Sequence, residues 1–212
     1  MRHGVVCEGV GMLIGASRIP GVCMVTPEIF RDDRGHFLST FSADADVMPP
    51  EIAFPVAQVS QSRSRAGVAR GIHFTTTAPG CAKLVWCSAG SALDFVVDLR
   101  VGSPTFGQVE MVELDPEVGR IVSMPVGVGH AYLATADDTV ITYLLSTVYV
   151  AANEQSVAIS DPDVGLPLPA AQDLVLSERD GAAHSLAWWQ DSGGLPEYAE
   201  SVRLDALLRS AG

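Results

Sequence analysis

Residues 83–99 read KLVWCSAGSALDFVVDL, two short apolar runs separated by Ser-Ala-Gly-Ser. β-Branched and aromatic residues favour strands, and small residues between two such runs favour a turn. Runs of this kind recur from residue 20 to about residue 150, where long helical periodicity is missing. The pattern predicts strands at Val56–Ser60, Val68–Phe74, Lys83–Cys87, Ala92–Leu99, Gln108–Leu114, Arg120–Met124, His130–Thr135 and Val140–Val150.

Evenly spaced short strands are typical of a barrel or a two-sheet jelly roll, and 212 residues suit one domain. We place a β-barrel core at residues 20–169, after an extension of residues 1–19. A C-terminal helical segment is expected at residues 170–212, with helices at Asp180–Gln190 and Glu197–Arg209. The apolar face of the second helix is expected to hold Tyr198, Val202, Ala206 and Leu207.

Charge and composition exclude several classes of protein. A net charge of −12 argues against binding to a nucleic acid polymer, which needs a basic face. No run approaches the ~20 apolar residues of a membrane span, and Glu8 with nearby glycines interrupts the only run suited to a signal peptide. The cysteines have neither disulfide-framework nor zinc spacing, which favours reduced thiols in the cytoplasm. They are Cys7, Cys23, Cys81 and Cys87.

The octapeptide GVARGIHF, residues 67–74, places an arginine and a histidine in an otherwise apolar strand. Side chains of a regular strand alternate between two faces, so Arg70 and His73 would point in opposite directions. Glycine tolerates the backbone of a β-bulge, and bulges are common next to active sites. If both side chains face the barrel interior, we predict a bulge at Gly71 that re-aims one of them.

Other polar groups interrupt the predicted strands, although inward positions of a small barrel are usually apolar. They are Lys83, Asp94, Asp98, His130 and Tyr143. Each alone has a structural explanation, such as a solvated strand face, but their occurrence on neighbouring strands indicates a site. A histidine, a lysine and a phenol suit proton removal next to a carbonyl: His73 is the base, Lys83 stabilises the enolate and Tyr143 returns a proton.

A metal site is the main competing interpretation, because many small β-barrels bind a metal through a His-x-His pair and a carboxylate. Here GIHFTTTAPG, residues 71–80, offers one histidine and no following ligand. Three-ligand coordination by His36, His73 and His130 stays open but has no spacing to support it. The chain has no Gly-x-Ser-x-Gly elbow, phosphate loop or dinucleotide fingerprint, which weakens hydrolase, kinase and dehydrogenase hypotheses.

A series of motifs spans the chain from about residue 20 to residue 200. They are DDRGHF (32–37), QVSQSRSRAGVARGIHF (58–74), AKLVWC (82–87), LDFVVDLRVGSPTFG (93–107), GVGHAYL (127–133), ITYLLSTVYVAANE (141–154), SDPDVGLPLP (160–169) and LSERD (176–180). In content and order they resemble the dTDP-4-keto-6-deoxyhexose 3,5-epimerase family. The resemblance implies an all-β double-stranded β-helix (cupin) jelly-roll barrel with flanking helices. It also implies a homodimer that acts on a dTDP-linked 4-keto-6-deoxy sugar and needs no metal or cofactor.

The same resemblance implies roles for individual residues. His73 would be the general base, Asp180 would orient its ring, Tyr143 would be the acid on the opposite sugar face, and Lys83 would stabilise the enolate oxygen. The implied substrate contacts at the sugar and pyrophosphate are Arg70, Asp94, His130, Glu154 and Arg179. Those at the nucleotide are Gln58, Ser39 and Ser60, with Arg34 and Phe37 reaching across from a partner subunit.

Several positions depart from the rhamnose-pathway pattern. Ser39 stands in place of a glutamate, Ser60 of an asparagine, Trp86 of an arginine and Leu168 of a tryptophan. Because these positions mostly concern binding, we expect the proton-transfer chemistry to be retained and favour the antibiotic-sugar branch, whose members invert carbon 3, carbon 5 or both. Two alternatives stay open: a barrel that binds a sugar nucleotide without turnover, and a metal-dependent cupin enzyme.

Overall fold

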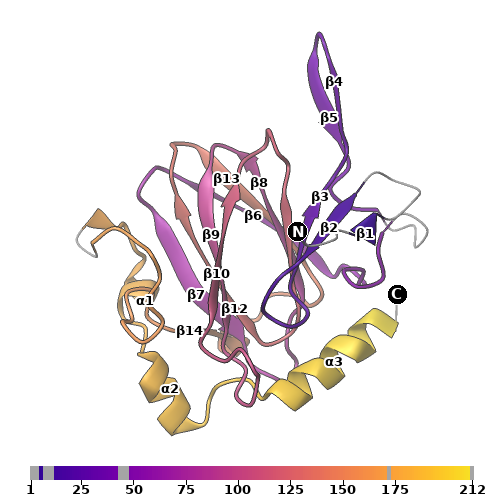
Figure 1. Ribbon diagram of the computed structural model, residues 1–212. Coiled ribbons are helices and arrows are strands. Elements are labelled where there is room, and N and C mark those ends of the chain that lie inside the picture. Colours follow the sequence, from indigo (N-terminus) through magenta and orange to yellow (C-terminus); the bar gives the residue numbers. More distant parts are fainter. Residues whose placement is uncertain (1–4, 7–11, 43–47, 171–172, 211–212) are drawn as a thin grey trace.

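The computed structural model describes residues 5–6, 12–42, 48–170 and 173–210. Two antiparallel sheets face each other, helices flank them, and one hairpin projects away from the barrel (Figure 1). The first sheet has seven strands in the order β1 (Val5–Val6), β2 (Leu13–Ala16), β3 (Cys23–Thr26), β11 (Ile121–Met124), β8 (Lys83–Ala89), β13 (Thr139–Leu145) and β6 (Gln58–Ser64). This two-sheet barrel confirms the predicted all-β class.

The second sheet has five strands, and its central members are buried on both faces. Its order is β10 (Val109–Leu114), β9 (Ala92–Asp98), β12 (Val128–Ala134), β7 (Ala69–Thr75) and β14 (Glu154–Ser156). The projecting hairpin pairs β4 (Ile29–Asp32) with β5 (Gly35–Leu38). A 3₁₀ turn, η1 (Ala151–Asn153), precedes β14.

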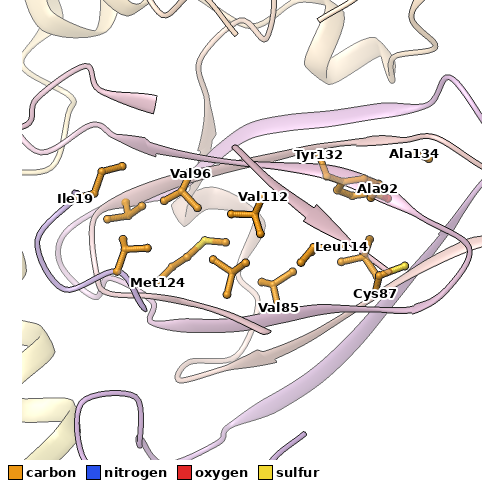
Figure 2. Packing of buried hydrophobic residues seen from close by; sticks show 14 residues of the cluster. Ile19, Val85, Cys87, Ala92, Val96, Val112, Leu114, Met124, Tyr132 and Ala134 are labelled. Atoms are coloured by element: carbon orange, nitrogen blue, oxygen red, sulfur yellow. The ribbon is translucent and has the colours of Figure 1, made fainter. Parts of the chain in front are cut away.

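Between the sheets, inward side chains of both form one apolar cluster (Figure 2). Val85 and Met124 come from the seven-stranded sheet and pack toward Val96 and Val112 of the five-stranded sheet. Strand alternation explains this packing, because odd-numbered residues of β8 and even-numbered residues of β9 and β12 face inward. Burial of these side chains drives the two sheets together.

The outer face of each sheet is covered by C-terminal elements. Phe74 on the five-stranded sheet packs edge-to-face against Trp189 of α2 (Leu186–Ser192), with ring centroids 5.2 Å apart. Leu204 and Leu208 of α3 (Tyr198–Ser210) pack with the cluster on the outer face of the seven-stranded sheet. None of the helices in the described part of the chain has the length and apolar character needed to span a bilayer.

The predicted strands are confirmed, most with ends shifted by one or two residues, and the two largest shifts are in β6 and β13. β6 extends to Ser64, four residues beyond the predicted end. The apolar pattern did not predict this extension, because the inward positions of β6 carry serine rather than apolar side chains. The prediction Val140–Val150 is too long: β13 ends at Leu145, and 146–150 form a connection into η1. Leu13–Ala16, within the segment expected to precede the barrel, forms β2 and pairs with β3.

The helix expected at Asp180–Gln190 is wrong, because the structure has two short helices there. α1 (Glu178–Gly181) and α2 are separated by residues 182–185. Each begins at its own serine N-cap: Ser177 accepts a hydrogen bond from the backbone of Asp180, and Ser185 accepts one from the backbone of Trp188. Serine competes with the helical backbone for hydrogen bonds, so it favours helix starts over helix interiors.

The helix expected at Glu197–Arg209 is confirmed as α3, but its predicted apolar face is wrong. Val202 and Leu207 are 47% and 54% exposed. The inward face instead carries the fully buried Ser201 together with Leu204 and Leu208. The face of α3 that carries Ser201 approaches Gly127 closely, and the small serine side chain fits between them.

The bulge predicted at Gly71 is confirmed. The register of β7 against β12 pairs His73 with His130 but Arg70 with Tyr132, so the ladder shifts between these pairs. Ala69, Ile72 and Phe74 join the outer cluster, whereas Arg70 and His73 line the interior cavity. Gly71 has φ +115°, and a Cβ there would lie 2.5 Å from the carbonyl oxygen of His130, so only glycine fits.

Candidate active site

A cavity of about 420 Å³ lies between the two sheets. Its walls come mainly from β6, β8 and β13 of one sheet and from β7 and β12 of the other. The lining residues are Gln58, Ser60, Ser62, Arg70, His73, Cys81, Lys83, His130, Tyr132, Tyr143, Leu145, Thr147, Val148, Tyr149 and Glu154. The cavity therefore combines cationic, hydroxyl and imidazole groups inside a barrel whose remaining interior is apolar.

His73, which is half-buried, and the buried Asp180 form an acid–imidazole pair at one wall. The ring Nε2 lies 2.6 Å from Oδ1 of Asp180, whose side chain is 4% exposed. Although burial alone would raise the pKa of Asp180, hydrogen bonds from His73, Ser177 and the backbone of Gly71 hold that pKa below its ordinary value. The carboxylate therefore stays charged and accepts the Nε2 proton, which leaves the lone pair on Nδ1 of His73.

Tyr143 lies on β13, in the sheet opposite His73 on β7. Burial raises the pKa of its phenol above the ordinary value, and the adjacent Tyr132 adds to the rise. Tyr143 therefore keeps its proton near neutral pH. Its ring also meets His130 edge-on, with centroids 6.0 Å apart.

Lys83 and His130 supply further polar groups to the cavity. Lys83 occupies an inward position on β8 and is 7% exposed, and its ammonium has no hydrogen-bond partner within the described residues. His130 Nε2 lies 2.6 Å from Oδ2 of the fully buried Asp94. Asp94 thus holds the His130 ring from behind, as Asp180 holds His73.

Of the other predicted contacts, Gln58, Ser60, Arg70 and Glu154 line the cavity. Gln58 donates to Ser60 Oγ at 2.8 Å and accepts the backbone N–H of Tyr149. Glu154 accepts the Thr75 hydroxyl. Gln58 and Ser60 are therefore linked to each other, whereas Glu154 is held by Thr75 of the neighbouring strand β7.

Five predicted contacts do not line the cavity of this chain. Asp94 lies behind His130, and the other four lie on or near the surface. Arg34 and Phe37 lie on the projecting hairpin, with the Arg34 side chain 90% exposed and paired with Asp32. Ser39 directly follows the hairpin. Arg179 lies on the surface and donates to the backbone carbonyl of Glu154.

Sequence reasoning missed several lining residues. Tyr132 and Ser62 face the cavity, and Tyr149 and Cys81 lie on its wall. The inward alternation of His130 predicts an inward residue 132, which is the one signal that was available for Tyr132. Asp98, singled out with Asp94, instead accepts hydrogen bonds from Arg100, Ser103 and Thr105 and has a structural role outside this cavity.

Within the part of the chain that the structure describes, no three His, Cys, Asp or Glu side chains gather as a metal site would require. His36 lies on the hairpin, whereas His73 and His130 are each paired with a carboxylate in the barrel. His73 and His130 therefore meet at one cavity, but His36 does not join them.

Comparison with known proteins identifies the family. The family model described as dTDP-4-dehydrorhamnose 3,5-epimerase matches residues 16–187. The chain belongs to this family. A dTDP-4-dehydrorhamnose 3,5-epimerase from Streptomyces griseus is 40% identical over 196 residues, covering 92% of this chain and 96% of the relative.

Solved structures of family members share the fold. NovW, a 4-keto-6-deoxy sugar epimerase from the novobiocin cluster of Streptomyces spheroides, superposes with a TM-score of 0.85 at 40% identity, covering 94% of this chain and 100% of NovW. ChmJ, a 3'-monoepimerase from Streptomyces bikiniensis in complex with dTDP-quinovose, has a TM-score of 0.85 at 38% identity, covering 92% of this chain and 98% of ChmJ. The cupin jelly-roll expected from the motifs is thus confirmed.

Proposed function

We propose that this protein is an epimerase of a dTDP-linked 4-keto-6-deoxyhexose that inverts carbon 3, carbon 5 or both during deoxysugar biosynthesis, in an antibiotic or rhamnose pathway. One observation carries the proposal: His73 with its carboxylate and the protonated Tyr143 line one cavity from opposite sheets. Inversion requires a base on one face of a carbon and an acid on the other. Family membership supports the same activity.

In the first step, Nδ1 of His73 removes the proton from a carbon next to the 4-keto group. The C–H electron pair forms a double bond to carbon 4, and the carbonyl electron pair moves to the ketone oxygen, which becomes negatively charged. The ammonium of Lys83, which has no hydrogen-bond partner among the described residues, supplies the positive charge that this enolate oxygen needs. Asp180 stabilises the imidazolium that forms, because its carboxylate lies 2.6 Å from Nε2.

In the second step, the Tyr143 hydroxyl donates its proton to the same carbon from the opposite face. The carbon is then inverted, the ketone re-forms, and the phenolate and imidazolium exchange protons with solvent. No electron acceptor is required, since substrate and product are isomers. The chemistry needs only the groups that this chain supplies.

Binding of the nucleotide sugar is assigned to the remaining polar groups of the cavity. Arg70 offers a guanidinium for the diphosphate, and His130 offers an imidazole for the sugar. Gln58, Ser60 and Glu154 line the same cavity and are assigned to the sugar and the base. The acidic net charge of the chain is compatible with this assignment, because the cationic side chains of Arg70 and Lys83 lie together in the cavity.

We also propose a homodimer in which the hairpin of one protomer completes the site of the other. Phe30 and Phe37 on the hairpin are 56% and 67% exposed, with ring centroids 6.5 Å apart, and Arg34 lies beside them at the tip. An aromatic pair and an arginine on a projecting hairpin suit stacking on a nucleobase and pairing with phosphate in a neighbouring cavity. The cytoplasmic location expected from the cysteines stays a prediction.

The activity is tested by solvent exchange. The protein is incubated with the dTDP-4-keto-6-deoxy sugar in heavy water, and deuterium at carbons 3 and 5 is followed by NMR. Deuterium at either carbon supports the proposal and identifies the carbon that is deprotonated, and the configuration of the labelled sugar shows whether that carbon is inverted. A folded protein that exchanges neither carbon contradicts the proposal. His73→Ala is expected to lower exchange by about 10²-fold or more, while His184→Ala, a surface histidine stacked on Trp188, is the matched control.

Complementation tests the shared site. Arg34→Ala and His73→Ala variants are each expected to be impaired alone. After the two are mixed and allowed to exchange subunits, one cavity of each mixed dimer has an intact His73 and receives an intact Arg34. Random exchange makes about half of the dimers mixed, and each of these has one working cavity of two, so activity should recover toward about a quarter of the wild-type value. A monomer by light scattering, or no recovery in a verified mixed dimer, would show that the hairpin does not serve a partner.

A further inference from the structure

A chain of hydroxyl groups runs along the cavity wall from Arg70 to Tyr143, and its three middle members have no part in the steps above. Arg70 Nε and Nη2 lie 3.3 Å from Ser64 Oγ, and Ser64 Oγ lies 2.9 Å from the hydroxyl of Tyr132. The Tyr132 hydroxyl lies 2.9 Å from Ser62 Oγ, which is 3.3 Å from the hydroxyl of Tyr143. Arg70 is therefore connected to Tyr143 through three hydroxyl groups.

The fold brings these groups together from four strands. Ser62 and Ser64 occupy alternate, inward positions on β6, which pairs with β13, the strand of Tyr143. Tyr132 on β12 pairs directly with Arg70 on β7, across the register shift at Gly71. Tyr132 and Ser64 are 1% and 4% exposed, so bulk water does not compete for their hydroxyl groups.

The donor direction in this chain is fixed at one end. A guanidinium donates hydrogen bonds and accepts none, so Arg70 must donate to Ser64. In each of the three contacts between hydroxyl groups either oxygen can donate, and the arrangement that continues from Arg70 has Ser64 donating to Tyr132, Tyr132 to Ser62 and Ser62 to the Tyr143 oxygen. In that arrangement each linking hydroxyl uses its single proton, and the proton of Tyr143 itself stays free.

We propose that Tyr132 is a positioning residue that acts through Ser62 on Tyr143, so that the Tyr143 oxygen accepts a hydrogen bond and its own proton points into the cavity. The proposal rests on the proposed function, in which Tyr143 is the acid. When Tyr143 gives up its proton, the Ser62 hydroxyl already donates to the resulting phenolate. The chain ends on the positive charge of Arg70, which favours that phenolate further.

A consequence is that one residue serves two ends of the substrate. Arg70 is assigned to the diphosphate, and the same guanidinium anchors the chain that orients the acid at the sugar. Tyr132→Phe removes the central hydroxyl while keeping a ring of nearly the same shape, so the surrounding core stays packed.

The first test separates inversion from deprotonation. In heavy water, His73 alone supports exchange with retention, whereas inversion needs the proton from Tyr143. Tyr132→Phe is expected to lower the ratio of inverted to retained deuterated sugar about tenfold, with exchange and KM nearly unchanged. Ser62→Ala should act in the same way and Ser62→Thr should restore the ratio. The control is Tyr198→Phe, because Tyr198 lies against Arg100 outside the cavity.

A wild-type ratio in Tyr132→Phe would overturn the proposal. So would an equal loss of exchange and inversion, which indicates general damage to the site. The second test needs no substrate, so it stands even if wild-type protein shows no exchange and the proposed epimerase activity fails.

In the second test, the protein carries ¹³Cζ-tyrosine and its NMR signals are recorded at neutral pH. Tyr143→Phe assigns the Tyr143 signal among the four tyrosines. Ser64→Ala removes a hydroxyl three hydrogen bonds away from Tyr143, and it is expected to shift the Tyr143 signal if the chain is continuous. An unmoved Tyr143 signal in Ser64→Ala, with the fold intact, would show that the chain does not transmit to Tyr143.

Discussion

Substituting Gly71 by alanine tests whether the bulge is what brings His73 and Arg70 to one cavity. The added Cβ would lie 2.5 Å from the His130 carbonyl oxygen and 2.7 Å from Ala131 Cα, both on the neighbouring strand. The φ of +115° adds a backbone cost of about 1–2 kcal/mol for a residue with a side chain. Forcing an atom into such contacts adds about 1–3 kcal/mol. The expected loss of unfolding free energy is about 2–5 kcal/mol.

Thermal unfolding measures this loss, and Gly102→Ala is the matched control. Gly102 also has a positive φ, +86°, but a Cβ there meets nothing within 4 Å. For a domain of this size each kcal/mol lowers Tm by about 2–4 °C. Gly71→Ala should therefore melt clearly below Gly102→Ala and lose solvent exchange into the sugar, because β7 must move. Equal Tm values with retained exchange would refute the role of the bulge.

Three further outcomes follow from the site. Lys83→Met should lower the rate of exchange about 10²-fold with a smaller change in KM, measured by steady-state kinetics, because the enolate loses its cation. Asp180→Asn should lower exchange about 10²-fold, while Glu178→Gln, an exposed acid on the same helix, should leave it unchanged. Hydrogen bonds hold the pKa of Asp180 below its ordinary value, so its stabilising effect is present above the unfolded-state pKa and is lost as pH falls through the folded one. Below about pH 4, Tm of the wild type should therefore fall more steeply than that of Asp180→Asn.

Much of the site was predictable from strand periodicity. Lys83, His130 and Tyr143 occupy inward positions of strands whose apolar residues identified both faces. The conflict between Arg70 and His73 in one strand was also informative, because only a bulge resolves it and Gly71 was the residue able to form one. Local patterns predict these features because they depend on neighbours in the chain.

Other features depend on residues far apart in sequence. Asp180 reaches His73 only because two serine caps divide the expected helix and leave Asp180 in the short α1 beside β7. The serines of β6 have no apolar alternation, so nothing in their own segment indicated that Ser62 and Ser64 would face inward. Their direction is set by pairing with β13, and the tyrosine hydroxyl groups that they contact, Tyr132 and Tyr143, lie 68 to 81 residues away in the sequence. Tertiary context therefore overrides composition at these positions.

The interior of this barrel holds two sets of side chains with different chemistry, an apolar cluster and a polar cavity. Apolar side chains such as Val85, Val96 and Met124 supply the burial that holds the sheets together, whereas the cavity groups contribute little of it. Selection can therefore alter cavity residues such as Ser60 without threatening the integrity of the fold. Such a partition gives the scaffold high evolvability: one barrel can be adapted to a new sugar by a few substitutions while its proton-transfer machinery is inherited unchanged.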